Sequence, residues 1–253
     1  MKRVHFTEKY LLDPTHPITI SLVGVGGTGS QTLTSLARIN HALLTLGHPG
    51  LHVRAYDNDE VTEANIGRQL FSESDIGLNK ANVLVTRINR FFGIDWECVQ
   101  DLYGTGQEEP ENIIISCVDS VKSRILIGNS IEGRSGIDYR RRLYWLDFGN
   151  GTNFGQVVLG TLGIIEQPQS KKYEVVSGLK TVTEFFDLTQ VDEKDSGPSC
   201  SLAEALRKQD LFINSTLSQL GCALLWKLIT NGMIDYQGAF LNLDTMDVNP
   251  IKL

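Results

Sequence analysis

The chain has 253 residues, of which 41% are hydrophobic and 21% are charged, and its formal net charge is -7. This composition is ordinary for a folded protein and excludes wholesale disorder. The chain is long enough for one large α/β domain. The acidic balance argues against a broad nucleic-acid surface. Without a signal-peptide core or a long apolar run, we expect a cytoplasmic protein with no membrane partner.

The first predicted elements are a strand, a glycine turn and a helix. The apolar run at 18–23 is typical of a buried strand, and Leu33, Leu36 and Ala37 give the segment after the glycines a helical stripe. Apolar and polar residues alternate over 51–57, which is typical of a second strand. The two strands and the helix between them have the length of a βαβ unit. A parallel sheet is therefore expected.

Helices and strands then continue to alternate along the chain. The pattern predicts a helix at 79–92, strands at 96–99 and 112–118, a helix at 122–131, strands at 143–148 and 155–162, one or two helices within 201–229, and a strand at 238–244. We predict the α/β class, with a doubly wound, mostly parallel, Rossmann-like sheet and additional antiparallel strands. A single domain, 1–253, is expected, with an inserted or crossing loop at 163–199 where the pattern weakens.

The glycine turn predicts a phosphate-binding site. In "GVGGTGS", Gly24, Gly26 and Gly29 fit GxGxxG, and small side chains there let phosphate approach the amides at a helix start. A turn that merely fits a helix to a strand has the same pattern, and the lysine of a Walker P-loop is absent. Because Asp57 ends the second strand, an NAD-dependent oxidoreductase is one candidate.

A polar group after the second strand favours ATP over NAD. Its members are Asp57, Asp59, Asn65, Arg68, Gln69 and, further on, Lys80. A dinucleotide site does not need this set, whereas positive side chains would offset the charge of a triphosphate. Simpler explanations exist, since Arg68 has Asp75 as a possible ion-pair partner and Lys80 would suit a solvated helix position.

Four segments resemble the ThiF/MoeB/E1 family of ubiquitin-like-protein activating enzymes. In chain order they are "GVGGTGSQ", "DNDEVTEANIGRQ", "GLNKANV" and "SCVDSVKSR". The overall pattern is also similar to the ThiF-like proteins of PRTRC systems. The resemblance implies ATP-dependent adenylation of a carboxylate, the carboxy terminus of a small ubiquitin-like or sulfur-carrier-like protein, by an enzyme that forms a homodimer. A non-catalytic nucleotide-binding scaffold is a third possibility.

The resemblance also implies which residues bind ATP and Mg²⁺. They are Gly26, Gly27, Gly29, Asp57, Asp59, Asn65, Arg68, Lys80 and Asp119, and Gly24 of the GxGxxG pattern is added to this set. Asp57 or Asp59 would bind the ribose, while Arg68 and Lys80 would stabilise charge on the phosphates. Asp119 would hold Mg²⁺, which prefers oxygen ligands, although an aspartate there also suits the N-cap of the next helix. Arg124 would lie near the same site.

Cys200 is the candidate for acyl transfer to sulfur. The stretch "GPSCSLAEAL" places it at a predicted helix start, where amide dipoles favour a thiolate, although an ordinary cysteine near a helix cap fits the same pattern. Cys98 and Cys117 fall in predicted strands and Cys222 in an apolar helix, so we interpret them as core residues. The chain has no CxxC pair, and we therefore expect no structural zinc site.

Overall fold

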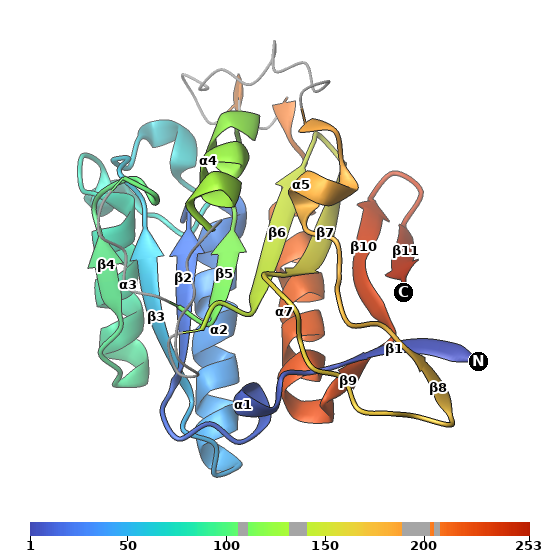
Figure 1. Cartoon of the computed structure of the whole chain (residues 1–253). Helices are drawn as coiled ribbons and strands as arrows, with labels where there is room; N and C mark the ends of the chain where they lie inside the picture. Colours follow the sequence, from blue (N-terminus) through green and yellow to red (C-terminus); the bar gives the residue numbers. More distant parts are fainter. Residues whose placement is uncertain (106–110, 132–140, 189–202, 205–207) are drawn as a thin grey trace.

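The computed structural model describes residues 1–105, 111–131, 141–188, 203–204 and 208–253. Two sheets are formed in this part of the chain (Figure 1). The strands are β1 (Lys2–Phe6), β2 (Ile18–Val23), β3 (Leu51–Tyr56), β4 (Glu97–Val99), β5 (Ile113–Ser116), β6 (Tyr144–Asn150), β7 (Phe154–Thr161), β8 (Tyr173–Val175), β9 (Met233–Ile234), β10 (Tyr236–Asn242) and β11 (Asp247–Lys252). The helices are α1 (Lys9–Leu12), α2 (Gly27–Thr45), α3 (Lys80–Phe92), α4 (Val121–Ile131), α5 (Val182–Phe185) and α7 (Ile213–Asn231), with short 3-10 turns η1 (Glu63–Asn65) and η2 (Glu73–Asp75).

The large sheet has the strand order β11-β10-β7-β6-β5-β2-β3-β4. The neighbours from β4 to β6 pair in parallel, whereas β7, β10 and β11 are antiparallel to their neighbours. The predicted α/β fold with extra antiparallel strands is confirmed. Since β3 and β5 flank β2 on opposite sides, the turn after β2 lies at the topological switch point, where sheets of this kind bind ligands.

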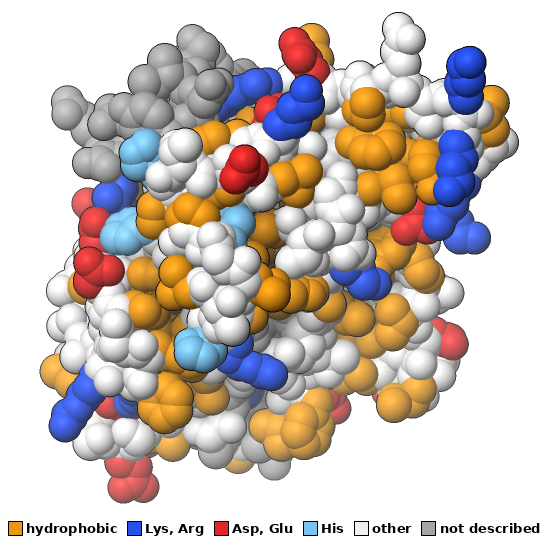
Figure 2. Space-filling view, turned by 90° about the horizontal axis from the view of Figure 1, so that it is seen from below, with side chains coloured by type: hydrophobic (Ala, Val, Ile, Leu, Met, Phe, Trp, Pro, Cys, Tyr) orange, Lys and Arg blue, Asp and Glu red, His pale blue; other side chains and the backbone are white. Residues whose placement is uncertain are grey.

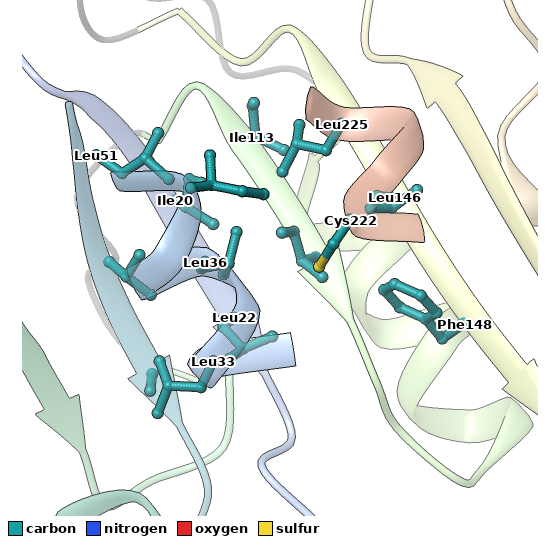
Figure 3. Packing of buried hydrophobic residues seen from close by; sticks show 14 of the residues in the cluster. Ile20, Leu22, Leu33, Leu36, Leu51, Ile113, Leu146, Phe148, Cys222 and Leu225 are labelled. Carbon is teal, nitrogen blue, oxygen red and sulfur yellow. The ribbon is translucent and has the colours of Figure 1, made fainter. Parts of the chain in front are cut away.

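Helices cover both faces of this sheet. The helices α2, α3 and α7 contribute to the main core on one face, while α4 and α5 cover the other (Figure 1). The main core includes Leu22 of β2, Leu36 of α2 and Leu225 of α7 (Figure 3). Each such buried leucine stabilises the fold by about 1.5–3 kcal/mol. This packing fixes the start of α2 against the sheet.

Local sequence explains where α3 begins and ends. The Asn79 side chain accepts a hydrogen bond from the Asn82 amide at 2.9 Å, as an N-cap does, and Gly93 ends the helix with φ of 67°. The predicted helix at 79–92 is therefore confirmed. The cap also fixes Lys80 as the first residue of the helix, directly beside the ends of β2 and β3.

The small sheet joins distant parts of the chain. Its order is β8-β1-β9, with Lys2 opposite Tyr173 in the parallel β1–β8 pair. The predicted crossing loop, 163–199, is described as far as residue 188, and that part contains β8 and α5. Its function as a crossing loop stays a prediction.

The face at the amino ends of the parallel strands carries no metal site among the described residues. Histidine side chains lie over one half of this face, with charges of both signs scattered between them (Figure 2). His48 contacts the Leu11 carbonyl at 3.3 Å, and His52 contacts Glu97 at 3.0 Å. No helix in the described ranges has the length and hydropathy to cross a membrane.

Candidate functional site

Two positions of the glycine turn have no room for a side chain. Gly24 has φ of +82°, and a Cβ atom there would lie 3.0 Å from the Cys117 carbonyl oxygen. A Cβ atom at Gly29 would lie 1.9 Å from the Gly24 carbonyl oxygen. The helix α2 begins at Gly27, so its unpaired amides lie at the carboxyl edge of the sheet. The turn can thus present backbone N–H groups to an anion.

Asp57 holds this turn in place. Its carboxylate accepts one hydrogen bond from the Val25 amide at 2.8 Å and another from the Asp59 amide at 3.0 Å. Burial raises the pKa of Asp57, and these hydrogen bonds together with the charge of Lys80 oppose that shift. Both carboxylate oxygens are therefore engaged by the protein itself.

Lys80 and Asp59 form an ion pair beside the same turn. The Lys80 Nζ atom lies 2.8 Å from Asp59 Oδ2, and the Lys80 amide also donates to the Asp59 carbonyl at 2.9 Å. The Lys80 side chain is only 11% exposed, whereas that of Asp59 is 63% exposed. Lys80 is consequently not the solvated helix residue of the simpler explanation. Asp59 carries the more accessible carboxylate of the two predicted ribose ligands.

Asn65 shapes the loop that carries Arg68. Its side-chain oxygen accepts hydrogen bonds from the Thr62 amide at 2.9 Å and the Thr62 hydroxyl at 3.1 Å, which closes the turn η1. The Asn65 carbonyl then accepts from the Gln69 amide at 2.9 Å. Asn65 is buried, and its side-chain oxygen is used for hydrogen bonds within the loop.

Arg68 does not pair with Asp75. The Asp75 carboxylate instead accepts from Arg87 at 2.7 Å, and Arg68 donates to the side-chain oxygen of Gln209 at 2.6 Å. Burial lowers the pKa of Arg68. This half-buried guanidinium has no carboxylate partner in the described part of the chain.

Two buried polar atoms near the turn have no hydrogen-bond partner within the described residues. They are the Nε atom of Arg68 and the side-chain oxygen of Gln69. A Cβ atom placed on Gly26 would lie 3.7 Å from that Gln69 oxygen, so Gln69 lies against the glycine turn. Unpaired buried polar groups are rare and costly. A ligand with both acceptor oxygens and hydroxyl donors would satisfy them, and a nucleotide has both.

Asp119 follows β5, the neighbour of β2, and its side chain is exposed. It does not cap the next helix, because the Ser120 hydroxyl oxygen accepts from the Ser123 amide at 3.1 Å. Arg124 is turned into the protein, where it forms an ion pair with Asp147 at 3.1 Å. Among the described residues, no hydrogen bond or ion pair engages the Asp119 carboxylate, whereas Arg124 belongs to the interior.

Asp147 is a buried charge that our sequence prediction missed. It is 1% exposed, accepts from the Ser116 hydroxyl at 2.5 Å, and neutralises Arg124, which is 8% exposed. The Nη2 atom of Arg124 in turn donates to the carbonyls of Val118 and Phe148, each at 2.7 Å. An aspartate inside the otherwise apolar strand "LYWLDF" was the available signal, since buried charges need partners.

Three amide side chains near the turn were also missed, namely Asn150, Gln209 and Asn214. The Asn214 oxygen accepts from the Thr28 hydroxyl at 2.9 Å and from the Asn150 amide group at 2.8 Å. A Cβ atom on Gly27 would lie 2.6 Å from Asn214 Nδ2, so that glycine makes room for the contact. These contacts connect the predicted site to α7.

The structure describes three of the four cysteines. Cys222 is buried in α7, and burial raises its pKa to about 12. Cys117 lies just beyond β5 rather than within the strand, and burial raises its pKa well above the usual range. Cys98 lies in β4. Cys200 lies outside the described residues, so its proposed acyl transfer stays a prediction.

The fold and the glycine turn together define a Rossmann-like α/β protein with a glycine turn at its switch point. The ThiF family model matches residues 12–251, and the chain belongs to that family. The chain is 30% identical over 128 residues to ubiquitin-like modifier-activating enzyme 5 of Drosophila pseudoobscura pseudoobscura, which is 43% of this chain and 30% of that protein. It is 23% identical over 175 residues to the enzyme of the same name from Branchiostoma floridae, which is 60% of this chain and 38% of that protein.

Solved structures support the same fold. The chain superimposes on E. coli MccB with a TM-score of 0.62 and 16% identity, over 96% of this chain and 63% of that protein. PaaA gives a TM-score of 0.59 and 13% identity, over 93% of this chain and 64% of that protein. The chain thus spans less than two thirds of each of these relatives, and at such identities the structural likeness establishes the fold alone.

Proposed function

We propose that this protein binds ATP at the glycine turn and adenylates a carboxylate. The observation that carries the proposal is Arg68, a half-buried cation with no carboxylate partner in the described ranges, on a loop that lies against the turn. MccB has been crystallised with ATP, and the sequence relatives are named as activating enzymes for a ubiquitin-like modifier. These facts support a nucleotide triphosphate as the ligand here.

In the proposed reaction, a carboxylate oxygen of the substrate attacks the α-phosphorus of ATP. The bond from that phosphorus to the bridging oxygen breaks, pyrophosphate leaves, and an acyl adenylate forms. The protein has to align the two reactants and stabilise the charge that develops on the phosphates. We assign charge stabilisation to Arg68 and Lys80, and ribose binding to Asp59, because Asp57 is occupied by the turn.

Asp119 suits a single contact to a nucleotide-bound Mg²⁺. A carboxylate is a ligand that this hard cation accepts, and Mg²⁺ at phosphate sites commonly uses one or two carboxylates beside the phosphates and water. The described residues contain no cluster of acidic, histidine or cysteine side chains that would hold the ion by itself. When bound, Mg²⁺ would offset negative charge on the phosphates.

We propose the carboxy terminus of a small ubiquitin-like or sulfur-carrier-like protein as the substrate. The proposal rests on the names of the sequence relatives and on family membership. By the same resemblance, we propose that the protein forms a homodimer and that a ThiF-type role in a PRTRC system fits this chain. Transfer of the acyl group to Cys200 would be a subsequent step.

The test combines binding and turnover. We expect calorimetric titration to show binding of MgATP but not of NAD, and Asp119→Ala to weaken MgATP binding. Asp101→Ala is the matched control, because Asp101 is an exposed aspartate that follows β4, two strands away from the turn. Addition of the substrate protein should then release pyrophosphate. Binding of NAD without binding of ATP would refute the proposal and favour an oxidoreductase. Binding of ATP without release of pyrophosphate would refute catalysis and favour a non-catalytic nucleotide-binding scaffold.

A further inference from the structure

A chain of amide groups fixes the direction of Gln209. The Gln209 Nε2 atom donates to the Gly151 carbonyl at 3.3 Å, and a carbonyl can only accept. The Gln209 oxygen therefore faces the other way, where it accepts from Asn214 Nδ2 at 2.9 Å and from Arg68 at 2.6 Å. Since a guanidinium can only donate, both ends of the Gln209 amide agree on one orientation.

Asn214 is in turn fixed by the nucleotide turn and the sheet. It is 2% exposed, and its oxygen is occupied by donors from Thr28 of α2 and Asn150 of β6. Only its NH₂ group is left to face Gln209. The position of the Arg68 guanidinium is thus connected through two side-chain amides to the first turn of α2.

The neutrality of Gln209 distinguishes Arg68 from other arginines in the described part of the chain. Arg54, Arg87, Arg124 and Arg142 each contact a carboxylate, those of Glu97, Asp75, Asp147 and Glu111 respectively. Arg68 has an amide oxygen in the corresponding place. An amide can orient a guanidinium without neutralising it, so the positive charge remains for an anionic ligand.

We propose that Gln209 is a positioning residue for the adenylation reaction: it aims the Arg68 guanidinium at the triphosphate and, being neutral, preserves its charge. The inference rests on the proposed function for the identity of the anion. It adds a contribution from the residues immediately before α7 to a site whose proposed nucleotide-binding residues, from Gly24 to Asp119, lie in the first half of the chain. A glutamate at this position would still accept from Arg68 through one carboxylate oxygen, but it would lose the hydrogen bond to the Gly151 carbonyl, and its charge would compete with the phosphates.

The decisive variants are Gln209→Glu and Gln209→Ala, titrated calorimetrically with MgATP. We expect Gln209→Glu to weaken binding by about tenfold or more, because a charged partner must be displaced, and Gln209→Ala to weaken it less. In an Arg68→Ala background, the additional effect of Gln209→Glu should largely disappear. The thermal midpoint of Gln209→Glu should stay close to that of the wild type, because the new ion pair with Arg68 offsets the lost hydrogen bond to the Gly151 carbonyl, whereas loss of structure would lower it. Unchanged MgATP affinity in Gln209→Glu would overturn the proposal.

A second measurement separates this inference from the proposed function. Nuclear magnetic resonance of arginine-labelled protein, with Arg68→Lys used for assignment, reports rotation of the guanidinium without any nucleotide. We expect slow rotation in the wild type and fast rotation in Gln209→Ala. Equally fast rotation in both would overturn the positioning role. If the wild type bound no ATP but showed slow rotation that depends on Gln209, adenylation would fail as the function while the positioning of Arg68 would stand.

Discussion

Removal of the Asp147 carboxylate provides the sharpest test of the energetics of the site. In Asp147→Ala, the Arg124 Nε atom loses its partner at 3.1 Å and the Ser116 hydroxyl loses its acceptor. Arg124 is only 8% exposed, so its charge would remain in the protein without compensation. Breaking a buried ion pair by removing one partner costs about 3–5 kcal/mol. We therefore expect the free energy of unfolding to fall by about that amount.

The assay is guanidinium chloride unfolding followed by circular dichroism, with Glu97→Ala as the control. Glu97 also accepts from an arginine, Arg54, at 2.9 Å, but its side chain is 49% exposed. Exposed pairs contribute about 0–1 kcal/mol, so the control should lose little stability. Equal losses in the two variants would refute the reasoning. We also expect Asp147→Ala to weaken MgATP binding, because Arg124 holds the Val118 carbonyl in the loop that leads to Asp119.

Three further predictions concern the core, the thiols and the response to pH. Leu22→Ala, at a fully buried position, should lower the free energy of unfolding by about 2–5 kcal/mol, and a loss below 1 kcal/mol by the same unfolding assay would contradict the packing. Cys222 is buried, and burial raises the pKa of its thiol, so we expect iodoacetamide to alkylate it in the native protein more slowly than the partly exposed Cys98, with site-resolved mass spectrometry as the readout and the opposite order as the contrary result. Burial lowers the pKa of His5, so as the pH falls below the ordinary value of 6.5 the unfolded chain takes up a proton before the folded one does. Stability should therefore decline below that pH, and less steeply in His5→Gln; identical pH profiles of the unfolding midpoint would exclude this cause.

Local patterns predicted the parallel half of the sheet well. The strands β2 and β3 are continuous or alternating apolar runs, and α3 carries both of its end signals in Asn79 and Gly93. The strands β1, β8 and β9 gave no such signal, because they are short and are stabilised by pairing with segments far away in the chain. The strand β11 contains Pro250, which lowers strand propensity, but it lies at an edge of the sheet where proline is tolerated.

Sequence reasoning about the site was limited in the same way, because it identifies residues that follow predicted strands but not contacts between distant parts of the chain. The sequence placed the candidate residues near the ends of β2 and β3 together, because they follow strands whose carboxyl ends must meet; their binding of a nucleotide stays a prediction. The ion pair between Asp59 and Lys80 was not predicted; it forms because the start of α3 lies beside the segment that follows β3. Gln209 was not found, because its contact with Arg68 joins positions 141 residues apart and a single glutamine carries no periodic signal. The competing Arg68–Asp75 pair was wrong because η2 turns Asp75 towards Arg87 on α3.

The pairing of α2 with α7 has a consequence for how the chain acquires its structure. Thr28 and Thr32 reach their partners Asn214 and Ser218 across 186 residues in each case. During synthesis, the glycine turn and α2 leave the ribosome long before α7 exists, so the apolar side of α2 stays uncovered in the meantime. Contacts of such long range slow folding and lengthen the exposure of apolar surface. The turn is thus made early in synthesis, whereas its contacts with α7 can form only after residues 213–231 have been made.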